Sequence, residues 1–145
     1  MRVTELAIQD YDEVRDLWSR TEGIGLSSAD TKEGFGMFLE RNPGLSLALR
    51  HRGRVVGTVM VGHDGRRGYL YHLVVEPEHR GNGWAKKMVA RGLAGLRALN
   101  IRKCHVFIFR SNLSGKGFWK SIDWVEREDI RVFSREITAG SKTPA

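Results

Sequence analysis

The sequence predicts an α/β (α+β) fold with a mixed, mostly antiparallel central sheet of about six to seven strands flanked by about four helices. Three observations favour this class. Two helical patterns occupy the first third of the chain, and the period then changes to two over residues 45–75. A strand, a Gly-rich turn and a long helical pattern follow in residues 69–99. A sheet with helices on both faces would bury all of these apolar positions.

The N-terminal segment is expected to form one strand and two helices. Residues 2–8 alternate between polar and apolar side chains, as a half-buried strand does. A helix is then predicted from Tyr11, with Asp10 as N-cap, to near Gly23. A second, short helix is predicted to begin after Asp30, which with Glu33 repeats this capping signal, and to end before the Asn42-Pro43-Gly44 turn.

The middle of the chain is predicted to be a three-strand antiparallel meander. Its strands cover residues 45–49, 55–61 and 69–75, and the turns between them carry Arg52-Gly53-Arg54 and Asp64-Gly65. Regular alternation along residues 69–75 would place Tyr71, Leu73 and Val75 on one face of the sheet and His72 on the other.

The third strand leads into a Gly-rich turn, Arg80-Gly81-Asn82-Gly83-Trp84-Ala85, and an amphipathic helix that ends near Asn100. Backbone N–H groups converge at such a helix start, which makes it a site for phosphates and other anions. A strand over residues 103–109, a helix over 112–122 and further β structure in 124–137 complete the predicted order. The pair formed by strands 69–75 and 103–109 is expected to be parallel, because a helix connects them.

Composition limits the class of protein. We predict one domain over residues 1–139 and a frayed tail over 140–145. The N-terminus lacks a secretory pattern and no run is long enough to span a membrane, so the expected compartment is the cytoplasm and no membrane partner is predicted. The net charge of +7 is spread along the chain, which argues against a nucleic-acid-binding domain and leaves it as the weaker alternative.

Metal binding is not predicted. The single Cys104 excludes a cysteine cluster, and His63, His79 and His105 have no partners at metal-ligand spacing. Cys104 is expected to pack in the sheet as a small apolar side chain.

The order of elements and two motifs resemble the GNAT superfamily of acyl-CoA-dependent N-acetyltransferases. The first motif of that family, Arg/Gln-x-x-Gly-x-Gly/Ala, reads Arg80-Gly81-Asn82-Gly83-Trp84-Ala85 here, after Leu73-Val74-Val75-Glu76-Pro77. The second motif is altered in residues 112–124, where Trp119 replaces the usual Tyr and Asp123-Trp124 replaces the usual Gly-Phe. Within the superfamily, the chain is most similar to small single-domain bacterial enzymes.

The resemblance implies acetyl-CoA as cosubstrate and no metal. The pyrophosphate of coenzyme A would lie on the N–H groups of the Gly-rich turn, and its pantetheine arm would pair with the strand before the turn. A coenzyme A thioester and an amine acceptor are the implied partners, and a homodimer is left open. The implied cofactor-binding residues are Leu73, Val74, Val75, Arg80, Gly81, Asn82, Gly83, Trp84, Ala85, Asn112 and Trp119.

The resemblance places catalysis at Trp119, Tyr71 and Tyr69. Trp119 stands where the family has a Tyr that protonates the leaving sulfur, and an indole N–H can donate a hydrogen bond but cannot transfer its proton. Packing in the core is an equally good interpretation of Trp119. Tyr69 stands where some relatives have a Glu base. Tyr71, His72 and Glu76 are the other candidate bases, with Tyr71 expected to line the acceptor site and His72 favoured as a structural side chain.

The acceptor is expected near residues 19–36, which are rich in Gly and Ser and carry Glu22, Asp30 and Glu33. These carboxylates would attract a cationic amine, although solvated loop charges are common. An acyl-CoA-binding module without transferase activity is the main alternative to an active enzyme, because Trp119 replaces the usual Tyr.

Overall fold

The computed structural model describes residues 1–137, and these fall into two compact units, Met1–Asn112 and the part that begins at Leu113. The predicted tail over residues 140–145, and the end of the predicted domain at 138–139, lie outside the described residues.

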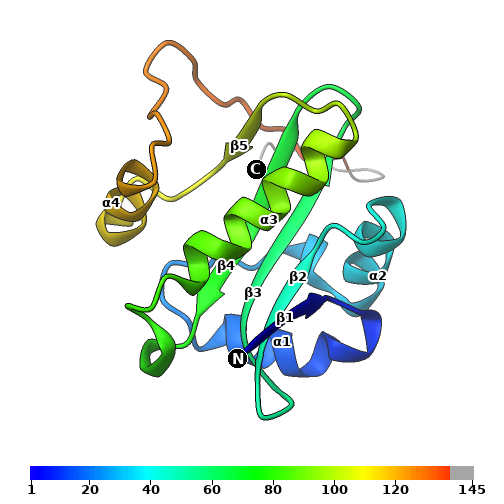
Figure 1. The fold of residues 1–145 in the computed structure, drawn as a ribbon. Helices are drawn as coiled ribbons and strands as arrows, with labels where there is room; N and C mark the ends of the chain where they lie inside the picture. Colours follow the sequence, from blue (N-terminus) through cyan, green and yellow to red (C-terminus); the bar gives the residue numbers. More distant parts are fainter. Residues whose placement is uncertain (138–145) are drawn as a thin grey trace. The chain divides into compact units, whose positions relative to one another are not determined.

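The first unit is built on a five-stranded sheet with the order β1-β2-β3-β4-β5 (Figure 1). The first four strands pair antiparallel with their neighbours, and β5 pairs parallel with β4. This confirms the predicted mixed, mostly antiparallel sheet, although the described residues hold five strands rather than six to seven. The bounds are β1 Arg2–Glu5, β2 Leu47–His51, β3 Arg54–His63, β4 Gly68–Val75 and β5 Cys104–Val106.

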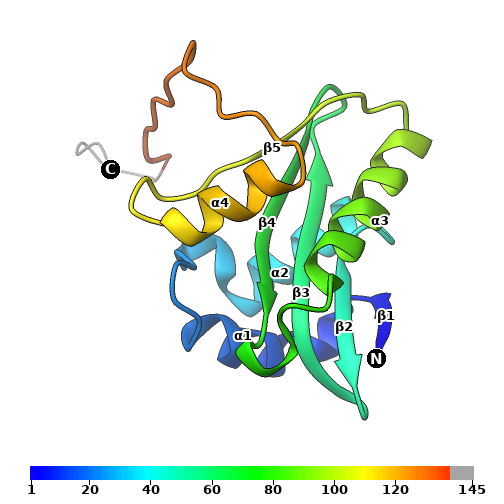
Figure 2. The ribbon, with the colours of Figure 1, turned by 60° about the vertical axis from the view of Figure 1, so that its left-hand side comes forward.

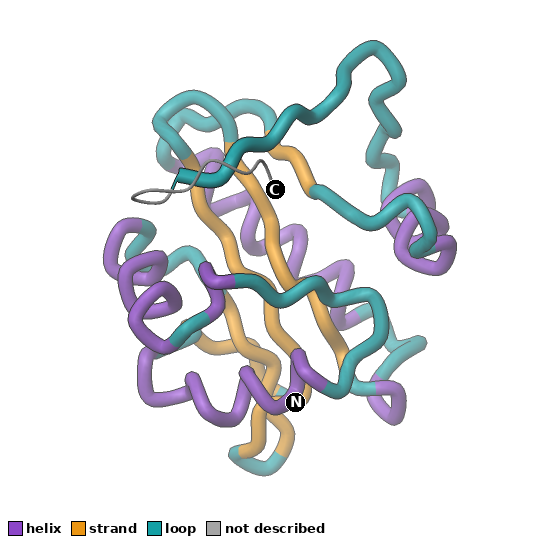
Figure 3. The backbone as a smooth tube through the Cα atoms, turned by 180° about the vertical axis from the view of Figure 1, so that it is seen from behind, coloured by secondary structure: helices purple, strands orange, loops and turns teal. Residues whose placement is uncertain are grey.

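Helices cover both faces of this sheet. α1 (Tyr11–Ser19) and α2 (Lys32–Arg41) lie on one face, and α3 (Trp84–Ala98) crosses the other (Figures 2 and 3). Short 3₁₀ turns precede each of them: η1 (Ile8–Asp10), η2 (Ser28–Asp30) and η3 (Pro77–His79). The predicted order of elements up to β5 is therefore confirmed.

Trp18 of α1 is the largest fully buried side chain of the core between α1, α2 and the sheet. Its ring lies edge-on to Phe35 of α2, with centroids 5.9 Å apart. Its indole Nε1 donates a hydrogen bond of 2.9 Å to Thr58 Oγ1 on β3. Since a buried indole N–H without a partner would be costly, this bond fixes α1 at one position on the sheet.

A β-bulge interrupts β4 at His72. Thr58 pairs with Val74 and Met60 with Tyr71, so two residues of β4 oppose one residue of β3. His72 has a φ of 49°, the left-handed conformation that a histidine rarely adopts. The predicted alternation along residues 69–75 is therefore wrong, because the bulge reverses which residues face α1 and α2: Tyr71 contacts Phe38 of α2, and Val74 belongs to the core around Trp18.

The second unit contains α4 (Leu113–Ser121). Trp119 is 7% exposed and packs on Phe118 and Trp124, with ring centroids 5.2 and 4.6 Å away. Asp123, two residues after the end of α4, has a φ of 70°, so an aspartate adopts the left-handed conformation where the family motif has Gly. Aspartate is one of the few residues that tolerate it, and the turn is formed without a Gly.

Residues 124–137 do not form a strand, so the β structure predicted there is wrong. Apolar side chains that would alternate in a strand are exposed instead, with Phe133 at 92% and Ile137 at 98%. An alternating pattern becomes a strand only when a partner supplies the ladder of hydrogen bonds, and the pattern alone does not reveal whether that partner exists.

Candidate active site

The Gly-rich turn forms the start of α3 without a side-chain cap. Gly81 and Gly83 have φ values of 84° and 80°, and a Cβ on either would meet no atom within 4 Å. The glycines are therefore required by the backbone conformation, and the space around them is open. Gly83 is the N-cap residue, and no side chain accepts a hydrogen bond at this helix start. No capping side chain therefore competes for the N–H groups of the first turn, and the residues that lead into it, Gly81 to Gly83, are exposed.

The charges around the turn also favour an anion. The first turn of α3 contains no acidic residue, and Lys86 and Lys87 are exposed there. Lys87 Nζ lies 4.4 Å from the centroid of the Trp84 ring, a cation–π contact. Arg80 Nε donates a hydrogen bond of 2.7 Å to the carbonyl of Val75, which ties the turn to the end of β4. The helix dipole adds to this positive potential.

The edge of β4 that leads to the turn is open in the first unit. β5 pairs with β4 only from Gly68 to Leu70, and β4 continues to Val75 beyond the last pair. Among the described residues no strand pairs with Tyr71–Val75 on that side. An extended chain bearing amides could therefore add to this edge through main-chain hydrogen bonds.

Of the three predicted pantetheine residues, Val74 and Val75 have buried side chains, at 3% and 6% exposed, and Leu73 is partly exposed. Val74 packs in the core around Trp18. The valines therefore offer a ligand their backbone rather than their side chains.

Tyr69 and Tyr71 lie on β4 before the bulge. Tyr69 packs on His105 and Phe107, with ring centroids 5.8 and 5.9 Å away, and Tyr71 packs edge-on to Phe38 of α2 at 5.9 Å. Burial raises the pKa of Tyr71 above its ordinary value. Its hydroxyl therefore stays protonated at neutral pH and can act as a hydrogen-bond donor but not as a base.

Asn112 and Trp119 belong to different units. Asn112 ends the first unit, and its side-chain Nδ2 would lie 3.0 Å from a Cβ placed on Gly23. It therefore borders the loop after α1, the predicted acceptor region. Trp119 belongs to the second unit and is held there by Phe118 and Trp124.

Glu76, a candidate base, forms hydrogen bonds with two arginines. It is 3% exposed and accepts hydrogen bonds from Arg54 at 2.7 and 3.1 Å and from Arg20 at 3.0 Å. These bonds, Arg54 first, lower the pKa of Glu76. A carboxylate held in this way is a poor proton acceptor. Its role is to join the ends of α1, β3 and β4.

Replacing Glu76 with Gln is expected to destabilise the fold by about 2 kcal/mol at pH 7, because hydrogen bonds to a charged group are lost. The folded-state pKa lies below the unfolded value of about 4.3, so the stabilisation is present above that pH and is lost as the pH falls through the folded-state value. Urea unfolding should show a smaller difference in the free energy of unfolding between wild type and variant at pH 3 than at pH 7. Glu78→Gln, on the exposed 3₁₀ turn η3, is the control and should change little. An equal gap at both pH values would contradict this role for Glu76.

The structure brings Asp30 and His72 together, a pairing that the sequence did not predict. His72 Nε2 lies 2.7 Å from Asp30 Oδ1, and their side chains are 12% and 9% exposed. The predicted N-cap role of Asp30 falls instead to Thr31, whose hydroxyl accepts from the N–H of Gly34. The other two acidic residues of the predicted acceptor loop, Glu22 and Glu33, are exposed. No local signal could have revealed the pair, because 42 positions separate its members.

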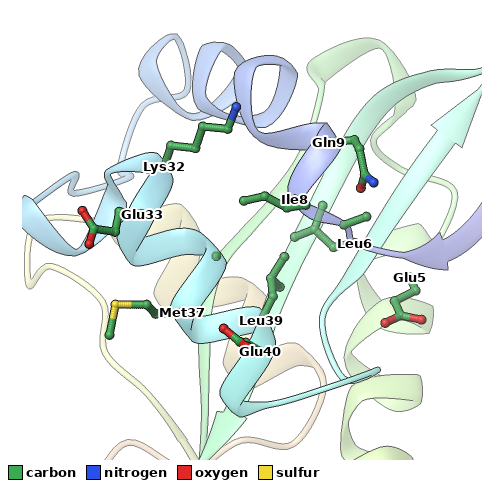
Figure 4. A pocket seen from close by; sticks show the side chains of 11 residues that line it. Glu5, Leu6, Ile8, Gln9, Lys32, Glu33, Met37, Leu39 and Glu40 are labelled. Atoms are coloured by element: carbon green, nitrogen blue, oxygen red, sulfur yellow. The ribbon is translucent and has the colours of Figure 1, made fainter.

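A separate hollow lies between η1 and α2 (Figure 4). Leu6, Ile8 and Leu39 gather at its centre, and the carboxylates of Glu5, Glu33 and Glu40 stand around them. Its lining includes none of the predicted cofactor or catalytic residues. Among residues 1–137, no three His, Cys, Asp or Glu side chains are grouped to hold a metal ion, and no helix of that part of the chain is long and apolar enough to cross a bilayer.

Comparison with known proteins identifies the class that this fold and site define. The acetyltransferase (GNAT) family model matches residues 11–124. An acetyltransferase of Photorhabdus laumondii is 37% identical over 138 residues, which cover 94% of this chain and 96% of that protein. An acetyltransferase of Yersinia pestis is 30% identical over 128 residues, 88% of this chain and 90% of that protein.

A solved structure shares the fold. The PaiA N-acetyltransferase of Thermoplasma acidophilum, crystallised with coenzyme A, superposes with a TM-score of 0.73 at 16% identity and covers 83% of this chain and 86% of its own. The chain therefore belongs to the GNAT acetyltransferase family. It is an N-acetyltransferase, as the sequence predicted.

Proposed function

We propose that the protein moves an acetyl group from acetyl-CoA to a primary amine by direct attack in a ternary complex. The observation that carries the proposal is the uncapped, acid-free start of α3 at Gly83, next to the open edge of β4. The pyrophosphate of the cosubstrate would accept from the N–H groups of residues 81–85, with Arg80 adding a charge at the rim. The amides of its pantetheine arm would pair along Leu73–Val75.

The chemical step needs a polarised thioester carbonyl and a neutral amine. A backbone N–H of β4 beside the bulge would stabilise the oxyanion. The amine nitrogen then attacks the carbonyl carbon, the C–S bond breaks with its electron pair on sulfur, and a proton from the amine converts the thiolate to the thiol. Holding both reactants at one edge of the sheet supplies much of the rate.

Tyr71, Tyr69 and Trp119 enter the proposal with different roles. The two tyrosines would line the acceptor site, because Tyr71 packs on Phe38 of α2 and Tyr69, two residues earlier on β4, lies on the same face of the sheet. Trp119 would at most donate a hydrogen bond to the sulfur, and its packing between Phe118 and Trp124 favours a structural role. A thiolate is a stable leaving group, so the reaction does not require a strong acid in that place.

The test combines calorimetry with a thiol-release assay. Acetyl-CoA is expected to bind in the micromolar range, whereas S-acetylpantetheine, which lacks the pyrophosphate, should bind at least about 100-fold more weakly. Thiol release is then measured with spermidine, kanamycin, a peptide with a free α-amine and an N-blocked peptide with one lysine. At least one amine should raise the rate above hydrolysis.

Two outcomes would contradict the proposal. Equal affinities for acetyl-CoA and S-acetylpantetheine would show that the start of α3 does not bind the pyrophosphate. Tight binding without thiol release for any amine would favour the acyl-CoA-binding module instead.

A further inference from the structure

His72 adopts a backbone conformation that costs free energy, and contacts with Thr58 and Trp18 hold it there. A histidine at φ 49° is less stable than a glycine by about 1–2 kcal/mol. Its carbonyl accepts a hydrogen bond of 2.7 Å from Thr58 Oγ1, and its ring packs on Trp18 with centroids 4.6 Å apart. Strained residues that the surroundings fix in this way are concentrated at functional sites.

Asp30 holds the imidazole ring of His72 in place. Asp30 Oδ1 lies 2.7 Å from His72 Nε2, and Asp30 Oδ2 accepts from the N–H of Ser27 at 2.9 Å. The backbone carbonyl of Asp30 accepts from the hydroxyl of Tyr11 at 2.6 Å. The carboxylate therefore has no freedom to turn away from the ring.

This geometry determines the tautomer of His72. An ionised carboxylate can only accept, so Nε2 must carry the proton, and Nδ1 of the neutral ring keeps a lone pair. Among the described residues, Asp30 is the titratable side chain in contact with the ring. The neighbours from α1 and β3, Trp18 and Thr58, are uncharged. The carboxylate beside Nε2 orients the ring and leaves Nδ1 to accept a proton, as in the carboxylate–histidine pairs of enzymes in which the histidine acts as a base.

We propose that His72 is the base that takes a proton from the acceptor ammonium, directly or through one water, and that Asp30 is the residue that positions it. The inference rests on the proposed function and assigns the role of base among the candidates Tyr71, His72 and Glu76. His72 immediately precedes Leu73–Val75, the backbone proposed to hold the thioester.

The proton and electron balance of the step is complete. The ammonium passes one proton to His72 Nδ1 and becomes a neutral amine, which attacks the thioester carbonyl. The second amine proton goes to the departing sulfur, giving the thiol and the amide. The imidazolium returns its proton to water, so the ring is unchanged after each turnover.

The test compares His72→Asn with wild type across pH 6 to 10. Asparagine tolerates positive φ, so the bulge should persist, and acetyl-CoA affinity should stay within about twofold. With the fastest amine of the four named above, kcat should fall about 100-fold at pH 7, the usual contribution of a general base. The loss of kcat should shrink to a few-fold at pH 10, where the amine deprotonates without a base. Added imidazole should restore part of the rate at pH 7.

Asp30→Asn should lower kcat about tenfold at pH 7, because an amide can donate as well as accept and no longer holds the ring in one tautomer. This loss of kcat should also shrink at pH 10, where the amine needs no base. His63→Asn, at the far end of β3, is the control and should leave every parameter unchanged. A loss in His72→Asn that is the same at every pH and insensitive to imidazole would overturn the inference and indicate a structural role. Failure of the wild type to release thiol with any amine would instead refute the proposed function, so the two failures are distinguishable.

Discussion

Replacing Gly83 with Glu is expected to abolish measurable acetyl-CoA binding, a loss of at least about 100-fold in affinity. Two effects add. Any side chain at φ 80° strains the turn, and a carboxylate at the N-cap would accept from the N–H groups that the pyrophosphate needs. Titration calorimetry of acetyl-CoA measures the loss directly, and thiol release should disappear with it.

Gly53→Glu provides the matched control. Gly53 has nearly the same conformation, φ 78°, with nothing within 4 Å of a Cβ, but it lies in the hairpin turn between β2 and β3. Both variants should lose similar stability, and only Gly83→Glu should lose the ligand. Equal affinities in the two variants would show that the start of α3 is not the phosphate site.

Truncating Trp18 to Ala is expected to destabilise the protein by about 4 kcal/mol, the largest stability change that we predict. The substitution leaves a cavity among α1, α2 and the sheet, and leaves the buried Thr58 hydroxyl without its donor. Thermal or urea unfolding followed by circular dichroism measures the change independently of the indole fluorescence that is removed.

Two companion variants separate the contributions. Trp18→Phe keeps most of the volume and loses the hydrogen bond, so about 1 kcal/mol is expected. Trp84→Ala removes a partly exposed indole and should cost less than that. If Trp18→Ala were no less stable than Trp18→Phe, the core would not depend on the volume of this ring.

The sequence was sufficient to predict the fold wherever a local signal and its partner lie close together. The hairpin at Arg52-Gly53 forms with both residues at positive φ, as the turn chemistry indicates. The helix that begins at Trp84 runs to Ala98, and Asn100 follows it with a φ of 64°. The Gly-rich turn was found for the same reason, because its glycines, strand and helix are contiguous.

Features that depend on residues far apart in the sequence could not be predicted from local patterns. The bulge in β4 depends on how β4 pairs with β3, and nothing in the order of Tyr71, His72 and Leu73 marks an extra residue. The Asp30–His72 pair depends in turn on the loop after α1 folding back to that bulge. The prediction for residues 124–137 failed in the opposite way: the alternating pattern is present, but no described strand pairs with it.

The extra residue in β4 makes the length of this strand as important as its composition. A deletion of one residue between Tyr71 and Leu73 would restore regular pairing with β3 and leave Val74 opposite Thr58 and Val75 opposite Gly57, as they are now. Regular pairing of all eight residues of β4 would instead turn Val74 and Val75 to the opposite faces from those they occupy now. An alignment or a designed variant that keeps His72 and treats β4 as an unbroken strand would therefore exchange its buried and ligand-facing residues. Comparisons with other members of the family should accordingly allow a gap at position 72 before equating residues on its two sides.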